Sequence, residues 1–178
     1  MRLLVVSLLL LTGCSLVLPQ INVSKSGFDG ATTVSTDHAY VYGSSSNMGI
    51  AFYKNTNMPK NEAVIDIRVG SGTISSGNSL HLKFGNEFLD YKSIDETSEN
   101  YMTGGYFVGN LYIQSATWSS KRYVVDMSII ERLAAEPVSL VRVDKGRSFE
   151  EGSLSANQPD SGKAIAKKFL EAVRANIK

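Results

Sequence analysis

An alternation of apolar and polar residues is the feature of this sequence that most restricts its fold. The segment Ala63–Val69 places four apolar side chains on one face and Asp66 and Arg68 on the other. Successive side chains of a strand point to opposite faces, so this period of two predicts a strand with one buried and one solvated face. A chain built from such segments must pair them into a sheet.

A second alternating segment ends in a turn. Leu80–Phe84 repeats the pattern, with His81 directed outward, and Gly85-Asn86 leads from it into Phe88–Tyr91. Glycine and asparagine tolerate the positive φ that a two-residue connection requires. These residues therefore predict a β-hairpin.

Further short segments of this kind occupy residues 28–140, separated by turns rich in Gly, Asn and Ser. Regularly spaced short strands are typical of a sandwich or barrel. The expected fold is mainly β, an antiparallel β-sandwich-like domain. The additional strands are expected at Thr32–Thr36, Ala39–Tyr42, Gly49–Lys54, Tyr106–Gln114, Arg122–Ser128 and Val138–Asp144.

Two segments predict helices. Ser128 and Glu131 have the spacing of a capping box, and helix formers continue to Glu136, which predicts one short helix. In residues 161–177 apolar residues recur every four positions, which predicts a C-terminal amphipathic helix that begins at Asp160 or Ser161. The recurring apolar residues are Ile165, Phe169, Val173 and Ile177.

The polar face of the C-terminal helix is basic and has two interpretations. Basic residues on an amphipathic helix can meet anionic lipid headgroups. The alternative is that the apolar stripe docks on the β core while the basic residues face solvent, and the narrow stripe without tryptophan favours it. The basic residues are Lys163, Lys167, Lys168, Arg174 and Lys178.

The N-terminal residues predict an export signal. Arg2 precedes a run of apolar residues that ends at Leu11 and is too short to span a bilayer, which is typical of a signal peptide. Leu11-Thr12-Gly13-Cys14 resembles the lipobox of bacterial lipoprotein precursors. The resemblance implies cleavage after residue 13 and attachment of acyl chains such as palmitate to Cys14. It thus implies a membrane-anchored protein of the cell envelope.

The expected organisation has three parts: a signal peptide at 1–13, a lipidated N-terminus and tether at 14–27, and a single β-rich domain at 28–178 that ends in helix 161–177. An alternative places a first strand at Leu16–Leu18 or Ile21–Val23. Ser15 stands where an aspartate would retain a Gram-negative lipoprotein at the inner membrane. In a Gram-negative cell the resemblance therefore implies the outer membrane.

The balance of charges and the positions of the two histidines argue against several functions. Cleavage removes Arg2 and leaves 17 basic against 17 acidic residues, whereas a nucleic-acid binder needs a basic surface. The two histidines are His38, which Asp37 could pair with, and His81, and neither has zinc-site spacing. No catalytic constellation, metal site or cofactor is predicted, so we expect a protein that is not an enzyme.

Aromatic residues are the best candidates for a binding surface. Trp118 lies in a segment, Ser115–Ser120, that resembles a hairpin loop, and Tyr106 follows a glycine pair. Exposed tryptophan is a common binding hot spot, although the Trp118 ring could instead close one end of the sandwich. We expect a non-enzymatic module that binds an envelope protein or presents a surface. The alternatives are an envelope enzyme acting on glycan, lipid or peptide, and a carrier of a small apolar ligand.

Overall fold

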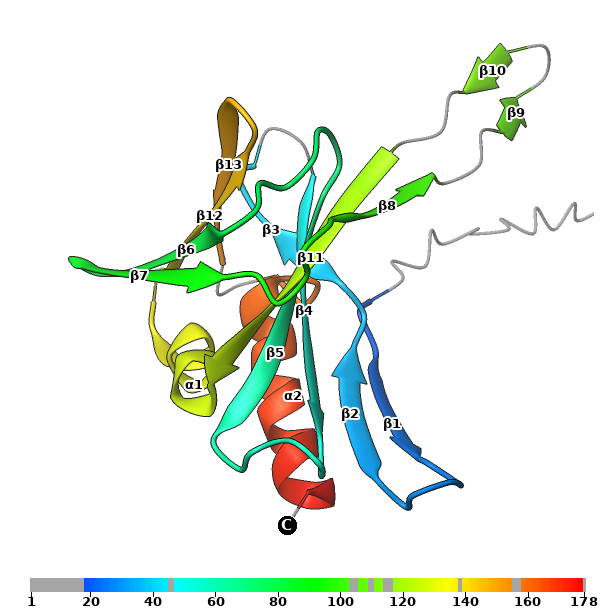
Figure 1. Cartoon of the computed structure of the whole chain (residues 1–178), viewed down its shortest axis with the longest axis vertical. Coiled ribbons are helices and arrows are strands. Elements are labelled where there is room, and N and C mark those ends of the chain that lie inside the picture. Colours follow the sequence, from blue (N-terminus) through cyan, green and yellow to red (C-terminus); the bar gives the residue numbers. More distant parts are fainter. Residues whose placement is uncertain are drawn as a thin grey trace, which may run out of the picture.

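Two antiparallel sheets, one of them curled into a half-barrel, pack together with two helices (Figure 1). This computed structural model describes residues 18–44, 47–102, 106–108, 111–113, 117–137, 139–154 and 158–177. The prediction of a mainly β, sandwich-like fold with a short helix and a C-terminal helix is confirmed.

The large sheet has the strand order β1-β2-β4-β5-β11-β8, and β3 pairs with the first residues of β4. Its central strands place apolar residues side by side, since Ile50 of β4 is opposite Ile67 of β5 and Phe52 is opposite Ile65. The strands are β1 (Ile21–Lys25), β2 (Thr32–Thr36), β3 (Ala39–Val41), β4 (Met48–Asn55), β5 (Glu62–Val69), β8 (Glu99–Met102) and β11 (Thr117–Asp126).

The four-stranded sheet has the order β13-β12-β6-β7. Its strands are β6 (Asn78–Phe84), β7 (Glu87–Lys92), β12 (Ser139–Lys145) and β13 (Ser148–Ser153). Phe84 pairs with Glu87 across Gly85-Asn86, and Gly85 has a φ of 59°, so the predicted hairpin is confirmed. A separate hairpin joins β9 (Tyr106–Val108) to β10 (Leu111–Ile113), where one strand was expected.

The two helices are α1 (Met127–Ala135) and α2 (Gly162–Asn176). The Ser161 side chain accepts a hydrogen bond from the Ala164 N–H at 3.2 Å, which confirms the predicted start of α2. The prediction of a capping box that begins at Ser128 is wrong. Asp126 at the end of β11 caps α1 instead, by accepting from the Ser128 N–H at 2.8 Å. Among the described residues, no helix is both long and apolar enough to cross a membrane.

The core lies between the inner faces of the sheets and under α2. Phe52 of β4 contacts Phe169 of α2, with ring centroids 5.6 Å apart. Between the sheets, the Tyr123 hydroxyl lies 2.9 Å from the Ser79 hydroxyl, and both residues are fully buried. The apolar stripe of α2 thus docks on the β core, as the favoured interpretation expected.

Lys163 departs from the prediction of a solvated basic face. Its side chain is buried, and its ammonium donates to the backbone carbonyls of Ala135, at 3.4 Å, and of Glu136. These carbonyls end α1, where a cation is favourable because the helix dipole leaves partial negative charge there. Burial lowers the pKa of Lys163. Lys163 therefore joins the two helices, whereas Lys167 and Lys168 are exposed.

The N-terminal segment also differs from expectation. A tether over residues 14–27 was predicted, but residues 21–25 form β1, as the alternative with a strand at 21–23 had it. The strand is held because Ile21 pairs with Thr36 and packs against the core, and the Asp37 N–H donates to the Gln20 carbonyl at 3.0 Å. Residues 1–17, which include the signal peptide and Cys14, lie outside the described residues.

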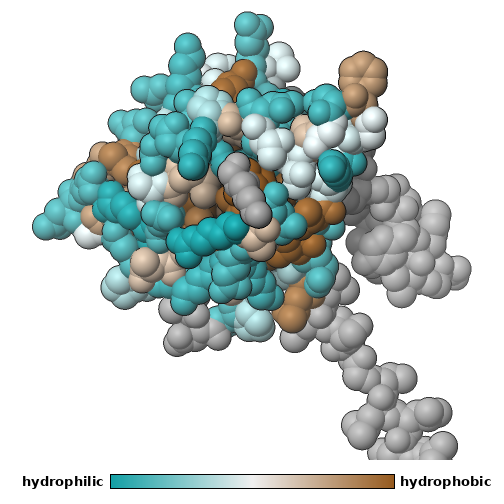
Figure 2. Space-filling model, turned by 90° about the horizontal axis from the view of Figure 1, so that it is seen from below, coloured by the Kyte–Doolittle hydropathy of each residue, from teal (hydrophilic) through white to brown (hydrophobic). Residues whose placement is uncertain are grey.

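The sequence missed two other strands, β8 and β13. It also placed Trp118 in a loop, whereas Trp118 is the second residue of β11. Seen from the end at which α2 terminates, the surface mixes hydrophilic side chains with apolar patches (Figure 2).

Candidate functional site

Two clusters of ionisable side chains lie on the outer faces of the two sheets. We call the first the His81 groove; it contains His81, Asp90, Arg142, Asp144 and Glu151 on the four-stranded sheet. We call the second the Arg68 cluster; it contains His38, Tyr40, Asp66, Arg68 and Trp118 on the large sheet.

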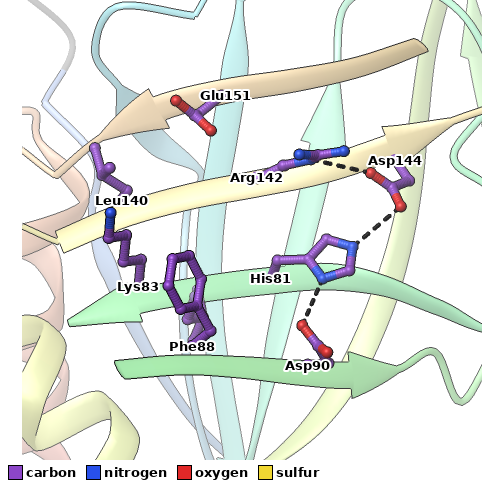
Figure 3. A pocket seen from close by; sticks show the side chains of 9 residues that line it. His81, Lys83, Phe88, Asp90, Leu140, Arg142, Asp144 and Glu151 are labelled. Atoms are coloured by element: carbon purple, nitrogen blue, oxygen red, sulfur yellow. Dashed lines mark hydrogen bonds and ion pairs between the residues drawn. The ribbon is translucent and has the colours of Figure 1, made fainter. Parts of the chain in front are cut away.

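Strand register assembles the His81 groove. His81 of β6 is opposite Asp90 of β7 and Arg142 of β12, and Arg142 is opposite Glu151 of β13. Neighbouring strands are about 4.8 Å apart, so this row places acidic side chains at its two ends and basic ones between them. The side chains line a hollow across the four strands (Figure 3).

Both ring nitrogens of His81 are engaged. Nδ1 lies 2.6 Å from an Asp90 carboxylate oxygen, and Nε2 lies 3.1 Å from Asp144 (Figure 3). Arg142 Nε donates to the other oxygen of Asp144 at 3.3 Å. Two ionised carboxylates accept from both nitrogens when the ring is an imidazolium.

These contacts set the charge and the role of His81. Burial acts to lower the pKa of His81, but the hydrogen bonds to Asp90 and Asp144 outweigh burial and raise it. When the ring is protonated, both nitrogens donate to carboxylates, and neither is free to accept a proton or bind a metal. Among the described residues no group of three or more His, Cys, Asp or Glu side chains could hold a metal ion. His81 therefore ties together three strands.

Two exposed phenylalanines flank the His81 groove at its edge strands. Phe88 of β7 is 68% exposed, and the Lys83 ammonium lies 4.9 Å from its ring centre. Phe149 of β13 is 52% exposed, and the Arg142 guanidinium lies 4.0 Å from its ring centre. Each ring is thus partnered by a cation from an adjacent strand of the same face.

The Arg68 cluster depends on a glycine. Tyr40 of β3, Gly49 of β4 and Arg68 of β5 lie in one row of the large sheet. A Cβ atom on Gly49 would lie 2.9 Å from Arg68 Nε and 3.2 Å from the His38 Cβ. The absence of a side chain at Gly49 therefore lets the Arg68 side chain lie close to the strand.

Arg68 packs against the tryptophan that the sequence singled out. Its guanidinium carbon lies 4.7 Å from the ring centre of Trp118, a cation–π contact between β5 and β11. Arg68 Nε is buried and has no hydrogen-bond partner among the described residues. Burial lowers the pKa of Arg68. A guanidinium with an unused donor is thus held beside an aromatic ring.

His38 and Asp66 lie next to Arg68. His38 Nε2 is 3.5 Å from an Asp66 carboxylate oxygen, and neither atom makes a hydrogen bond of good geometry within the described chain. Asp37, which the sequence suggested as the partner of His38, instead accepts from the Gln20 N–H at 3.1 Å and from Asn22 at 3.2 Å. The His38–Asp66 pair borders a hollow on the same face of the sheet.

Both apolar and polar residues line that hollow. Ala51 and Val64 are buried apolar lining residues, and Arg122 is a charged one. Arg122 is held by Asp95, whose carboxylate accepts from its guanidinium at 2.6 Å and from its backbone N–H at 2.7 Å. The other lining residues are Ser35, Thr36, His38, Phe52, Tyr53, Asp66 and Ile94.

The predicted site residues fall in different places. Trp118 belongs to the Arg68 cluster and is half-buried. Tyr106 pairs with Ile113 through its backbone in β9, and its side chain lies outside the described residues, as Cys14 does. Sequence reasoning placed Arg68 on an outward face but could not place it on Trp118, because that contact depends on the pairing of β5 with β11.

Comparisons with protein-family models, with curated proteins and with solved structures found no match. The chemistry of the two clusters is therefore the basis for a proposal about function.

Proposed function

We propose that this protein is a lipid-anchored, non-enzymatic module of the cell envelope that binds another protein through the Arg68 cluster. The observation that supports this most is the Arg68 guanidinium, which is stacked on Trp118 with a buried donor unused. Tyr40, 52% exposed, lies in the same row of the sheet. Tryptophan, tyrosine and arginine are the residues that dominate binding energy at protein interfaces.

The unused hydrogen-bonding groups favour the Arg68 cluster over the His81 groove. A buried polar atom without a partner costs stability in the free protein, and a ligand that supplies the partner recovers that cost. A peptide carbonyl or carboxylate could accept from Arg68, and the His38–Asp66 pair offers a further donor and acceptor. In the His81 groove both imidazole nitrogens already have partners.

The lipid anchor is supported by the sequence. The signal-peptide pattern and the lipobox resemblance at Leu11-Thr12-Gly13-Cys14 support an acyl-modified Cys14 at the start of the mature chain. In a Gram-negative cell Ser15 favours the outer membrane. We expect Cys14→Ser to release the protein from the membrane fraction and to remove the mass of the lipid, as measured by cell fractionation and mass spectrometry.

Site-specific photo-cross-linking in the host cell tests the binding surface. A photoreactive residue at Tyr40 should form one specific protein adduct, and Arg68→Ala in the same chain should abolish it. Phe88 is the matched control, because it is an exposed aromatic residue on the other sheet. An adduct that survives Arg68→Ala, or equal labelling from both positions, would reject the proposal.

An envelope enzyme acting on glycan, lipid or peptide is the second candidate. The His38–Asp66 pair at the border of a hollow that also contains Arg122 favours it, since such groups can move protons near a bound substrate. Under this alternative His38→Ala would abolish turnover of an envelope substrate yet leave the Tyr40 adduct intact.

A further inference from the structure

The loop between β1 and β2 presents a phenylalanine to solvent. Phe28 is 101% exposed, the highest exposure among the large apolar side chains of the described residues. The loop is nevertheless well ordered by hydrogen bonds: the Ser26 hydroxyl accepts from the backbone N–H of Phe28 at 3.2 Å and of Asp29 at 3.3 Å. The Gly30 N–H donates to the Ser26 carbonyl at 3.1 Å.

Asp29 fastens this loop to the neighbouring one. Its carboxylate accepts from the Ala31 N–H at 3.1 Å and from the Asn57 amide at 2.9 Å, and hydrogen bonds hold the pKa of Asp29 below its usual value. The free protein thus orders a loop whose phenyl ring is fully hydrated. Preorganisation of an exposed apolar group favours binding, because the ordering cost is met before contact is made.

An apolar groove lies at the same end of the molecule. Its lining residues Thr56 and Met58 flank Asn57, which donates to Asp29. The groove runs between the β4–β5 connection and the end of α2. Figure 2 shows this end, with apolar patches among hydrophilic side chains. The apolar lining residues are Met58, Met127, Leu170, Val173 and Ile177. The charged lining residues are Lys54, Lys60, Glu131 and Arg174, and Arg174 pairs with Glu131 at 3.3 Å.

We infer that this end of the molecule rests on a bilayer with anionic headgroups, with Phe28 entering the boundary between headgroups and acyl chains. Lys25 at the base of the loop and Lys60 beside the groove are exposed cations that would meet lipid phosphates. Apolar side chains flanked by cations are what an interfacial contact requires.

The length of the tether is consistent with this contact, which rests on the lipid anchor proposed above. Gln20 is held to Asp37 beside the start of β1, so the free tether runs from Cys14 to Gln20, six positions that span at most about 20 Å at roughly 3.4 Å each. The strand β1 and the start of the loop lead from Ile21 to Phe28, a distance of about 20 Å at roughly 3.3 Å per strand residue. A chain anchored at Cys14 can therefore bring Phe28 back to the membrane.

Fluorescence of a tryptophan at position 28 tests the inference. The chain from residue 14 onward would contain Cys14→Ser, so that no lipid contributes, and Trp118→Phe, which removes its one native tryptophan. Phe28→Trp is the reporter, and Phe149→Trp is the matched control at an exposed position of β13. The probes are vesicles of phosphatidylcholine alone or mixed in equal parts with phosphatidylglycerol.

We expect the emission of Phe28→Trp to shift to the blue with the anionic vesicles, while Phe149→Trp does not change. Phe28→Ala, in the Cys14→Ser chain, should lower affinity for the same vesicles about tenfold, because a buried phenyl ring is lost. No shift at position 28, equal shifts at both positions, or a shift produced by lipid-free envelope protein and not by vesicles would each overturn the inference. Fractionation of the Cys14→Ser protein tests the anchor separately, so the two failures are distinguishable.

Discussion

The His81 groove and the Arg68 cluster have nearly the same composition, since each places a histidine, an arginine and an aspartate on the outer face of a sheet. In the groove, His81 is bonded through both ring nitrogens and Arg142 shares Asp144 with it. In the cluster, Arg68 Nε, His38 Nε2 and an Asp66 oxygen make no hydrogen bond of good geometry within the described chain. Residue types alone would not separate them.

We propose that this difference separates a structural network, the His81 groove, from a candidate binding surface, the Arg68 cluster. A network whose donors and acceptors are matched stabilises the strands that it joins and has little to gain from a ligand. A network with unused groups costs stability in the free protein and recovers it on binding. Removal of His81 from the groove should therefore lower the free energy of unfolding, whereas removal of the Arg68 guanidinium should leave it unchanged or raise it.

Truncation of His81 should have the largest effect. His81→Ala leaves Asp90 and Asp144 without their shared hydrogen-bond partner, and we expect the free energy of unfolding to fall. The loss should be limited to about 1 to 2 kcal/mol, because Asp90 is largely exposed. Urea unfolding measures it. His38→Ala is the control and should cost less than about 0.5 kcal/mol, because His38 Nε2 makes no hydrogen bond of good geometry to Asp66. Equal losses for the two histidines would remove the distinction between the clusters.

A methyl group at Gly49 should disturb the Arg68 cluster alone. Gly49→Ala places a Cβ too close to Arg68 and His38 and forces both away from position 49, which should cost about 1 kcal/mol and move the guanidinium off Trp118. The change in Trp118 emission and the unfolding midpoint report both effects. Gly27→Ala, where no atom lies within 4 Å of the new Cβ, should change neither. An unchanged Trp118 spectrum in Gly49→Ala would mean that the glycine does not set the position of Arg68.

The dependence of stability on pH should be the smallest effect. Because the pKa of His81 is raised on folding, its ion pairs contribute in full below the unfolded pKa of about 6.5 and are lost as pH rises through the folded pKa. The loss is smaller than that of truncation, since a neutral imidazole keeps one donor. Urea unfolding across neutral pH should show this decline in the wild type and a flatter profile in His81→Gln. A decline of the same size in both would assign it to other groups.

Local patterns in the sequence predicted the fold well where the residues that decide the structure are adjacent. The alternation in Ala63–Val69, the Gly85-Asn86 turn and the cap at Ser161 each lie within one element and were confirmed. The strand β13 was missed because its glutamates and glycine resemble a loop, yet Glu150 and Gly152 are buried against β12 and its neighbours.

The site was less predictable, because its contacts join distant segments. Trp118 was selected as an aromatic residue, but its partner Arg68 lies 50 positions earlier and reaches it through the register of β5 with β11. His81 meets Asp144 across 63 positions. The helical repeat placed Lys163 on the solvated face of α2, but Lys163 is buried because the end of α1 lies opposite it.

The stability of Arg68→Met tests the central claim most directly. Methionine extends about as far as Arg68 Nε, fills that part of the site with apolar atoms, and removes the guanidinium, whose Nε is buried without a partner among the described residues. If Arg68 is retained for binding, urea unfolding should show a free energy of unfolding equal to that of the wild type within about 0.5 kcal/mol, or higher. A loss of more than about 1 kcal/mol would show that Arg68 is a structural residue and would contradict the account.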